Sequence, residues 1–271
     1  MTKLALGGHS FIEQLGNDPP ASAEEQRRIV AACLDAGIRL LDTTYYQERL
    51  ALGAALAALG RRAEARVTAW NFFRTPGKED ELVPFAPYAP GRFEEMLAEL
   101  RTDRLDVLVV HATDDAEDLG RQLRLAASWV ASGRVGEVAL GMARPEHLDQ
   151  LVPGHPVRRV LAPYNAFNRG AATTFARARE LGMEAVALSP FVRGWKLDAL
   201  GPAVSAAELL LRWVTGQELV DRVVVSMRRA EWVRANLAAE ARGPLSPPEA
   251  QQVDAWVARL GAQEQAPPPT R

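Results

Sequence analysis

Ionisable and aromatic side chains recur in this sequence where short apolar runs end. One apolar run is followed directly by Asp42, with Tyr45 and Tyr46 close behind, and a second, residues 105–110, is followed by His111. Carboxyl, phenol and imidazole groups are side chains that proteins use to transfer protons. An aspartate whose pKa is raised by burial, next to a histidine, would form an acid–base pair. Further runs end in the same way, at His9, Trp70, Arg144, Asn165, Ser189 and Ser226.

Eight short apolar runs alternate with helical patterns along most of the chain. This alternation predicts a single (β/α)8 TIM barrel, because each parallel strand needs a crossover helix before the next. Active sites of such barrels lie at the strand ends, so Asp42, His111 and Asn165 are expected to face one pocket at the C-terminal end. An open doubly wound sheet usually has a glycine-rich first turn, and Gly7-Gly8 is not a GxGxxG motif. The predicted strands are residues 3–6, 39–41, 66–69, 105–110, 135–140, 159–162, 184–188 and 222–225.

Helix starts and the domain limits can also be predicted. Ser22 and Ser205 are each followed three residues later by a glutamate, which is the spacing of a capping box, so each serine is expected to precede a helix. We expect residues 1–260 to form the barrel and the Pro/Gln-rich residues 261–271 to form a disordered C-terminal tail.

Bulk composition suits one large α/β domain, with 271 residues, 48% hydrophobic residues and a net charge of −2. The charge does not indicate nucleic-acid binding, and no apolar run reaches the roughly 20 residues of a membrane span. The N-terminus lacks the apolar core of a signal peptide, and the single cysteine, Cys33, excludes an internal disulfide. We therefore expect a cytoplasmic protein that acts on a small molecule, without nucleic-acid or membrane partners; the oligomeric state stays open.

The segment 42–46, followed by a helix that contains Gly53, resembles the signature of the aldo-keto reductases. The strand before His111 resembles the family strand that ends in the catalytic histidine. The resemblance implies Asp42, Tyr46 and His111 as catalytic residues, with the tyrosine donating a proton to a substrate carbonyl. Tyr46 is preferred because it lies seven residues before Gly53, and Tyr45 is the alternative.

Three later segments resemble the cofactor-binding segments of the same family. Residues 164–169 resemble its Tyr-Asn-x-x-x-Arg motif, and residues 189–194 resemble its Ser-Pro-Leu-x-x-Gly loop over the cofactor pyrophosphate. Residues 227–229 resemble its last cofactor segment, in which arginine contacts the 2′-phosphate of NADP and a later asparagine contacts adenine. The resemblance implies NADP as the cofactor, and implies as its ligands Asn165, Ser189, Arg193, Arg228, Arg229 and Asn236.

The catalytic lysine of the family has no counterpart in this sequence. The third predicted strand reads Val67-Thr68-Ala69-Trp70, and the only lysines before residue 196 are Lys3 and Lys78. We therefore expect a buried Asp42 without its usual cation, with Arg144 as a candidate substitute, and we expect Ala69→Lys to restore the charge. The family residues that hold and stack on the nicotinamide are also replaced, by Ala143, Arg144, Leu161 and Leu188.

Three hypotheses about function follow. The first is an NADP-dependent oxidoreductase that acts on a carbonyl or alcohol with a modified tetrad. The second is a barrel enzyme that uses Asp42, Tyr46 and His111 for non-redox elimination or isomerisation. The third is an inactive barrel that serves as a binding protein. A metal site of His9, Asp42 and His111 would be a further alternative, but no local ligand spacing supports it, and we predict no metal.

Two features next to these residues allow more than one interpretation. Trp70 would be either a wall facing the substrate or a cap on the barrel core. The aromatic-rich loop 71–90 would either cover the site or pack on the flank of the barrel or in an interface.

Overall fold

Eight parallel strands form a closed barrel in the computed structural model, which describes residues 2–13, 21–192, 197–200 and 203–261. Each strand pairs with its neighbours in chain order, and β1 closes the barrel by pairing with β8. The predicted single (β/α)8 barrel is therefore confirmed. The strands are β1 (Leu4–Gly7), β2 (Leu40–Tyr45), β3 (Arg66–Phe72), β4 (Leu105–His111), β5 (Val135–Gly141), β6 (Val157–Pro163), β7 (Glu184–Leu188) and β8 (Arg222–Val225).

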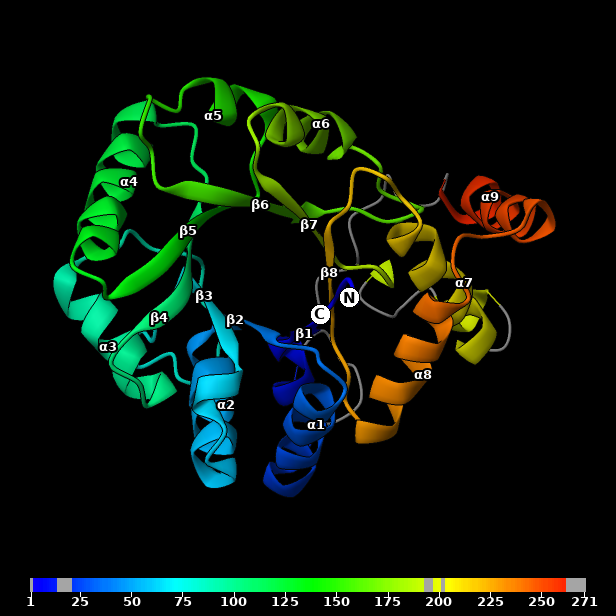
Figure 1. Ribbon diagram of the computed structural model, residues 1–271, viewed down its shortest axis with the longest axis horizontal. Coiled ribbons are helices and arrows are strands. Elements are labelled where there is room, and N and C mark those ends of the chain that lie inside the picture. The colour runs from blue at the N-terminus through cyan, green and yellow to red at the C-terminus, as the bar shows by residue number, and fades with distance from the viewer. Residues whose placement is uncertain (1, 14–20, 193–196, 201–202, 262–271) are drawn as a thin grey trace.

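Helices surround this barrel, as Figure 1 shows. Ser22 precedes the first helix as predicted, and its side chain accepts a hydrogen bond from the backbone of Glu25 at 3.2 Å. The prediction for Ser205 was wrong, because α7 already begins at Ala203 and Ser205 lies inside its first turn. The helices are α1 (Ala23–Asp35), α2 (Tyr46–Leu59), α3 (Pro90–Leu100), α4 (Ala116–Ala131), α5 (Pro145–Asp149), α6 (Ala172–Glu180), α7 (Ala203–Thr215), α8 (Ala230–Ala241) and α9 (Pro247–Gly261). None of the helices in the described ranges is long and apolar enough to span a bilayer.

Two apolar layers follow from the alternation of side chains along the strands. One layer fills the inside of the barrel and includes Trp70 and Val109. The other lies between the strands and the helices, and it includes Ala69 and Leu108. Neighbouring residues of β3 therefore point to opposite sides of the barrel wall. This register decides which side chain of β3 can reach Asp42.

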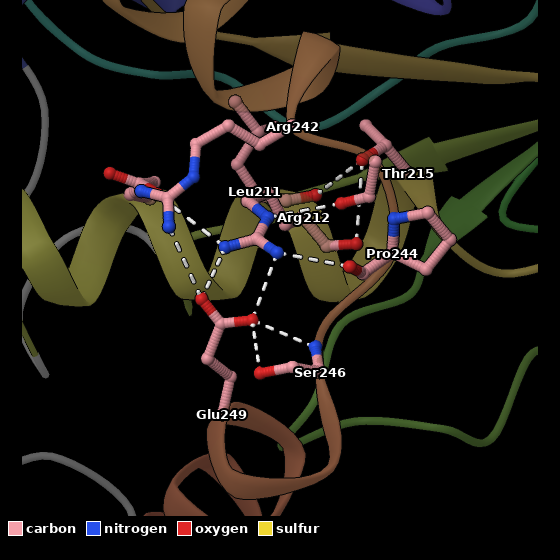
Figure 2. Close-up of polar contacts among 9 residues, drawn as sticks. Leu211, Arg212, Thr215, Arg242, Pro244, Ser246 and Glu249 are labelled. Carbon is pink, nitrogen blue, oxygen red and sulfur yellow. Dashed lines mark hydrogen bonds and ion pairs between the residues drawn. The ribbon is translucent and has the colours of Figure 1, made fainter.

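The last helix, α9, is held against α7 by a cluster of polar contacts around Arg212, which Figure 2 shows. The Arg212 side chain is 4% exposed and forms two hydrogen bonds with the carboxylate of Glu249, at 2.6 and 2.9 Å. It also donates to the carbonyl oxygens of Gly243 and Pro244. The backbone and hydroxyl of Ser246 bond to the same carboxylate, at 2.7 and 2.8 Å. We call these residues the Arg212–Glu249 cluster; in it, a buried cation has both an anion and backbone acceptors.

Candidate active site

Asp42 and Trp70 meet inside the C-terminal end of the barrel. The Asp42 carboxyl group on β2 is buried, and its Oδ1 accepts a hydrogen bond from the indole Nε1 of Trp70 at 3.0 Å. Burial raises the pKa of Asp42 to about 7; the Trp70 bond and His9 oppose this rise, and Glu48 adds to it. Where the family signature implies a lysine cation, this barrel therefore offers a neutral donor.

The indole of Trp70 reaches across the barrel from β3 towards β5. A Cβ atom at Gly141, on β5, would lie only 2.2 Å from the indole Cζ3, so a side chain there would collide with the ring. The ring also lies beside His111, with 6.2 Å between the two centroids. Trp70 belongs to the apolar interior of the barrel, and it also contacts Asp42 and His111 at the barrel end.

His111 ends β4 beneath the loop that follows β3. Its Nδ1 bonds to the carbonyl oxygen of Ala112 at 2.9 Å, and its ring stacks on Phe85 with 3.8 Å between centroids. A carbonyl can only accept, so Nδ1 carries a hydrogen and Nε2 is left as the acceptor in the neutral imidazole. Burial lowers the pKa of His111 and so favours this neutral form.

The loop 73–89 contacts both the end and the flank of the barrel. Phe85 covers the His111 ring at the end of the barrel. Tyr88 instead lies on the flank, where its hydroxyl donates to the carbonyl of Val109 at 2.7 Å and its ring contacts Trp129 of α4. Asn71 ties this loop down, because its side-chain amide bonds to the carbonyl of Ala86 at 2.8 Å.

The two adjacent tyrosines point in different directions. Tyr45 is the last residue of β2, and its ring lies 5.8 Å from that of His9 and 5.0 Å from that of Phe72, measured between centroids. Tyr46 is the first residue of α2, and its hydroxyl donates to the carbonyl of Glu79 in the loop at 2.7 Å. Tyr45 therefore lies with the other aromatic residues of the site, whereas the Tyr46 hydroxyl is bonded to the outer loop.

Arg144 does not replace the missing lysine, and this expectation was wrong. Its side chain is 57% exposed and pairs with Asp114 rather than with Asp42. His147, one turn into α5, accepts the backbone N–H of Arg144 at its Nδ1 and contacts Asp114 through its Nε2. Asp114 follows β4, so these contacts join two loops at the edge of the barrel end. The Arg144 guanidinium group is exposed to solvent and pairs with Asp114, so it does not lower the pKa of the Asp42 carboxyl.

Asn165 and Ser189 shape the ends of β6 and β7. The Asn165 amide donates to the carbonyl oxygen of Ser189 at 2.8 Å, and its Oδ1 accepts the backbone N–H groups of Phe167 and Asn168. Ser189 has a positive φ of 56°, which turns the chain sharply after β7. Asn165 therefore acts on the shape of this loop. Arg193, the other residue predicted here, lies outside the described residues.

A groove of about 760 Å³ lies between α1 and the start of α8, and it contains both arginines predicted to bind the 2′-phosphate. Arg228 and Arg229 share its wall with Arg28 and Arg234, which the motifs did not reveal because helix spacing alone does not distinguish them from surface residues. Glu25 also lines it, accepting the backbone N–H of Ala230 at 2.7 Å. Asn236 is half-buried further along α8 and is not part of the groove lining.

No three metal-ligating side chains gather among the residues that the structure describes, so His9, Asp42 and His111 do not form a metal cluster. The sequence reading also overlooked Glu48, which is fully buried in the first turn of α2 and contacts His9. An acidic residue in the first turn of the helix that follows Asp42 was the available signal.

Comparison with known proteins agrees with this geometry. Residues 3–199 match the model of the Aldo/keto reductase family. Among solved structures, the chain is similar to the holo form of aldo-keto reductase AKR11C1 from Bacillus halodurans, with a TM-score of 0.75 and 19% identity. That alignment covers 94% of this chain and 91% of the other. No curated protein matches the sequence. Since the family model spans most of the chain and the barrel is closed, this protein belongs to the aldo/keto reductase family.

Proposed function

We propose that the protein is an NADP(H)-dependent oxidoreductase that acts on a small carbonyl or alcohol substrate with a modified catalytic tetrad. Family and fold support an oxidoreductase of the aldo-keto reductase type. The observation that carries the choice of NADP is the groove between α1 and α8, whose lining combines four arginines with the acidic residues Glu25, Asp35 and Glu231. We place the enzyme in the cytoplasm, without nucleic-acid or membrane partners.

The phosphate end of the dinucleotide fits these residues. Guanidinium groups bind phosphate through paired hydrogen bonds, and Arg228 and Arg229 stand at the start of α8, where the helix dipole also favours an anion. The carboxylate of Glu25 occupies the same helix start, but it pairs with Arg28 at 3.0 Å, which limits its repulsion of a phosphate. When bound, the dinucleotide supplies a hydride.

The nicotinamide end fits less well. The nearest strand ends carry the apolar side chains of Leu161 and Leu188, which cannot hydrogen-bond a carboxamide, and the indole of Trp70 extends across the barrel beside them. A loosely held ring reacts slowly, because a misplacement of about 1 Å can cost roughly 10²-fold in rate. We therefore propose weak turnover of generic aldehydes.

Within this site we assign the position of the family tyrosine to Tyr45 and the substrate-orienting group to His111. Tyr45 is chosen over Tyr46 because the Tyr46 hydroxyl is bonded to the Glu79 carbonyl in the outer loop. A tyrosine has an ordinary pKa near 10, and no lysine among the described residues contacts Asp42 to lower it. Tyr45 would therefore be a poor proton donor at neutral pH without help from another group.

The proposal is tested by titrating the protein with NADPH and NADH and following tryptophan fluorescence. Arg228→Ala should weaken NADPH binding about 10- to 100-fold and leave NADH binding nearly unchanged, since it removes contacts to the 2′-phosphate. Arg121→Ala, on the exposed side of α4, is the matched control. Equal losses for the two dinucleotides would contradict the assignment of NADP.

A second candidate function is non-redox acid–base catalysis. The observation that favours it is the buried Asp42 carboxyl, whose pKa of about 7 lets it both donate and accept a proton at neutral pH. Binding of neither dinucleotide, together with an elimination or isomerisation activity that Asp42→Asn abolishes, would favour this candidate. Binding of neither dinucleotide and no such activity would favour an inactive binding protein.

A further inference from the structure

A histidine–glutamate pair stands beside the proposed site and has no part in the mechanism above. His9 lies in the short 3-10 helix after β1 (Gly8–Phe11), and its Nδ1 is 2.6 Å from Oε1 of Glu48 in α2. The other carboxylate oxygen, Oε2, accepts the backbone N–H of Thr44 at 2.6 Å. An ionised carboxylate only accepts, so the His9 Nδ1 donates, and proton exchange with any other group takes place at Nε2.

The pair is built into the fold. Glu48 is fully buried, and in the described part of the chain its ion-pair partner is His9. The neighbouring Arg49 turns away, towards Glu99 and the carbonyls of Trp70 and Phe72. Gly8 leaves room for the carboxylate, because a Cβ there would lie 2.3 Å from Glu48 Oε2. A buried carboxylate destabilises a fold unless it is hydrogen-bonded and paired. Glu48 therefore depends on its contacts with His9 and with the backbone of Thr44.

His9 faces the same group of rings as the proposed site. Its ring lies 5.8 Å from that of Tyr45, which contacts Phe72, and Phe72 in turn lies 6.0 Å from His111. The His9 side chain is 34% exposed, whereas Glu48 is 0% exposed, so the imidazole stands between a buried anion and the open end of the barrel.

We propose that His9 is a catalytic acid–base residue of this barrel and that Glu48 is its positioning residue, an inference that rests on the proposed function. In carbonyl reduction, the carbonyl carbon accepts a hydride, with its two electrons, from a reduced nicotinamide dinucleotide, which is thereby oxidised. The carbonyl oxygen accepts a proton from His9 Nε2, so that an N–H bond breaks and an O–H bond forms. Water then returns a proton to the neutral imidazole. In alcohol oxidation the same transfers run in reverse.

An imidazole suits this position because the tyrosine has lost its activating lysine. Histidine ordinarily titrates near pH 6.5, whereas tyrosine titrates near pH 10, so at neutral pH histidine is the more effective donor. A negative carboxylate at Nδ1 stabilises the imidazolium form that carries the proton. Proton transfer by a positioned side chain contributes about 10²- to 10⁴-fold to a rate.

The kinetic test compares variants in the NADPH-dependent reduction of 4-nitrobenzaldehyde. His9→Gln should lower kcat about 10²-fold and leave the Kd for NADPH unchanged, and Glu48→Gln should lower kcat about 10-fold. His155→Gln, in the loop before β6, is the control and should match the wild type. Added imidazole should partly restore the turnover of His9→Ala, which a purely structural role of His9 would not allow. An unchanged kcat for His9→Gln, or a loss confined to NADPH binding, would overturn the proposal.

A second measurement covers the case in which the proposed function itself fails, with neither dinucleotide bound nor aldehyde reduced. Nitrogen NMR of the free protein reports the tautomer and titration of His9, whose titratable neighbours among the described residues are Glu48, Asp42 and Tyr45. We expect a hydrogen on Nδ1 of His9. We also expect that His9 binds its proton at least tenfold more weakly in Glu48→Gln than in the wild type. Such a result supports the acid–base pair without redox chemistry. Identical titrations in the two proteins would overturn the inference.

Discussion

The Arg212–Glu249 cluster and the Asp42 site both bury ionisable groups, but only the first gives its charges a full set of partners. Arg212 bonds to a carboxylate and to two backbone carbonyls, and Glu249 receives further bonds from Ser246 (Figure 2). Within the described part of the chain, the Asp42 side chain has one hydrogen bond, from a neutral indole. The pKa values differ accordingly: Arg212 lowers that of Glu249 to about 2, and burial raises that of Asp42 to about 7.

This difference gives the Arg212–Glu249 cluster a role in stability and the Asp42 site the capacity for proton transfer. A fully paired carboxylate stays ionised at every physiological pH, so it holds two helices together but cannot exchange a proton. A buried carboxyl group with a pKa near neutrality costs stability whenever it ionises, but it can change its charge under the conditions of the cell. The cluster lies between α7 and α9 on the outside of the barrel, whereas Asp42 lies at the strand ends where catalysis takes place in such folds.

The largest effect is expected in the cluster. Arg212→Ala should lower the free energy of unfolding by about 3 kcal/mol, because two backbone carbonyls and the half-buried carboxylate of Glu249 lose their donor. Urea denaturation measures this change. The exposed pair of Arg121 and Asp118 on α4 provides the control, since Arg121→Ala should have little effect. Equal losses in the two variants would show that the cluster is no more than a surface contact.

A substitution at Asp42 is expected to raise the free energy of unfolding rather than lower it. The folded protein keeps this carboxyl protonated up to a pH of about 7, whereas the unfolded chain releases the proton near its ordinary pKa of 3.8. The folded state thus binds more protons between these values, so stability falls as pH rises through them and stays low above. Asp42→Asn removes the ionisation and should raise the free energy of unfolding at pH 8 by about 2 kcal/mol, part of the gain being offset by burying the amide N–H groups.

Urea unfolding of this variant and the wild type at pH 4 and pH 8 checks that prediction, and the difference should largely vanish at pH 4. Glu249→Gln is the control, because the contribution of Glu249 to stability depends on pH in the opposite direction. The depressed pKa of Glu249 stabilises the fold above its ordinary pKa of 4.5, and that contribution is lost as pH falls towards about 2. A less stable Asp42→Asn protein at pH 8 would contradict this account.

A cation placed inside the barrel should lower the pKa of Asp42, as Arg212 lowers the pKa of Glu249. Trp70→Lys puts an ammonium group on the inward face of β3 and should lower the pKa of Asp42 from about 7 by at least 1 unit, measured by carbon NMR of labelled aspartate. If the missing lysine is the main defect, reduction of 4-nitrobenzaldehyde should rise as well. Ala69→Lys, which the sequence suggested as the change that restores the charge, is the matched control. That expectation was wrong, because the side chain would enter the layer between strands and helices and should leave Asp42 unchanged.

The smallest effect is expected at Arg144. Arg144→Ala removes an exposed pair with Asp114, so it should leave the free energy of unfolding nearly unchanged, as is usual for ion pairs screened by water. The pKa of Asp42 should also stay the same in the NMR titration. A clear rise of that pKa would mean that Arg144 does act on the barrel interior, and would return it to the role expected from the sequence.

Local patterns predicted most of the scaffold. The limits of β7 and β8 agree with the predicted ranges, since local signals such as Gly182 before β7 mark them. Strands β2 and β3 extend three or four residues further than predicted, to Tyr45 and Phe72. Those extra residues are polar or aromatic, and pairing with neighbouring strands rather than their own propensity makes them extended.

The sequence by itself determined the barrel, the strand ends where ionisable residues stand and the lack of a lysine in the third strand. The order of strands and helices suffices for this, because parallel strands with crossover helices close in only a few ways. Only the tertiary structure decided that Trp70 rather than Ala69 reaches Asp42, that Tyr46 turns outwards and that Arg144 pairs with Asp114. The physical reason is that side chains alternate along a strand, so a shift of one residue moves a group to the other side of the barrel wall.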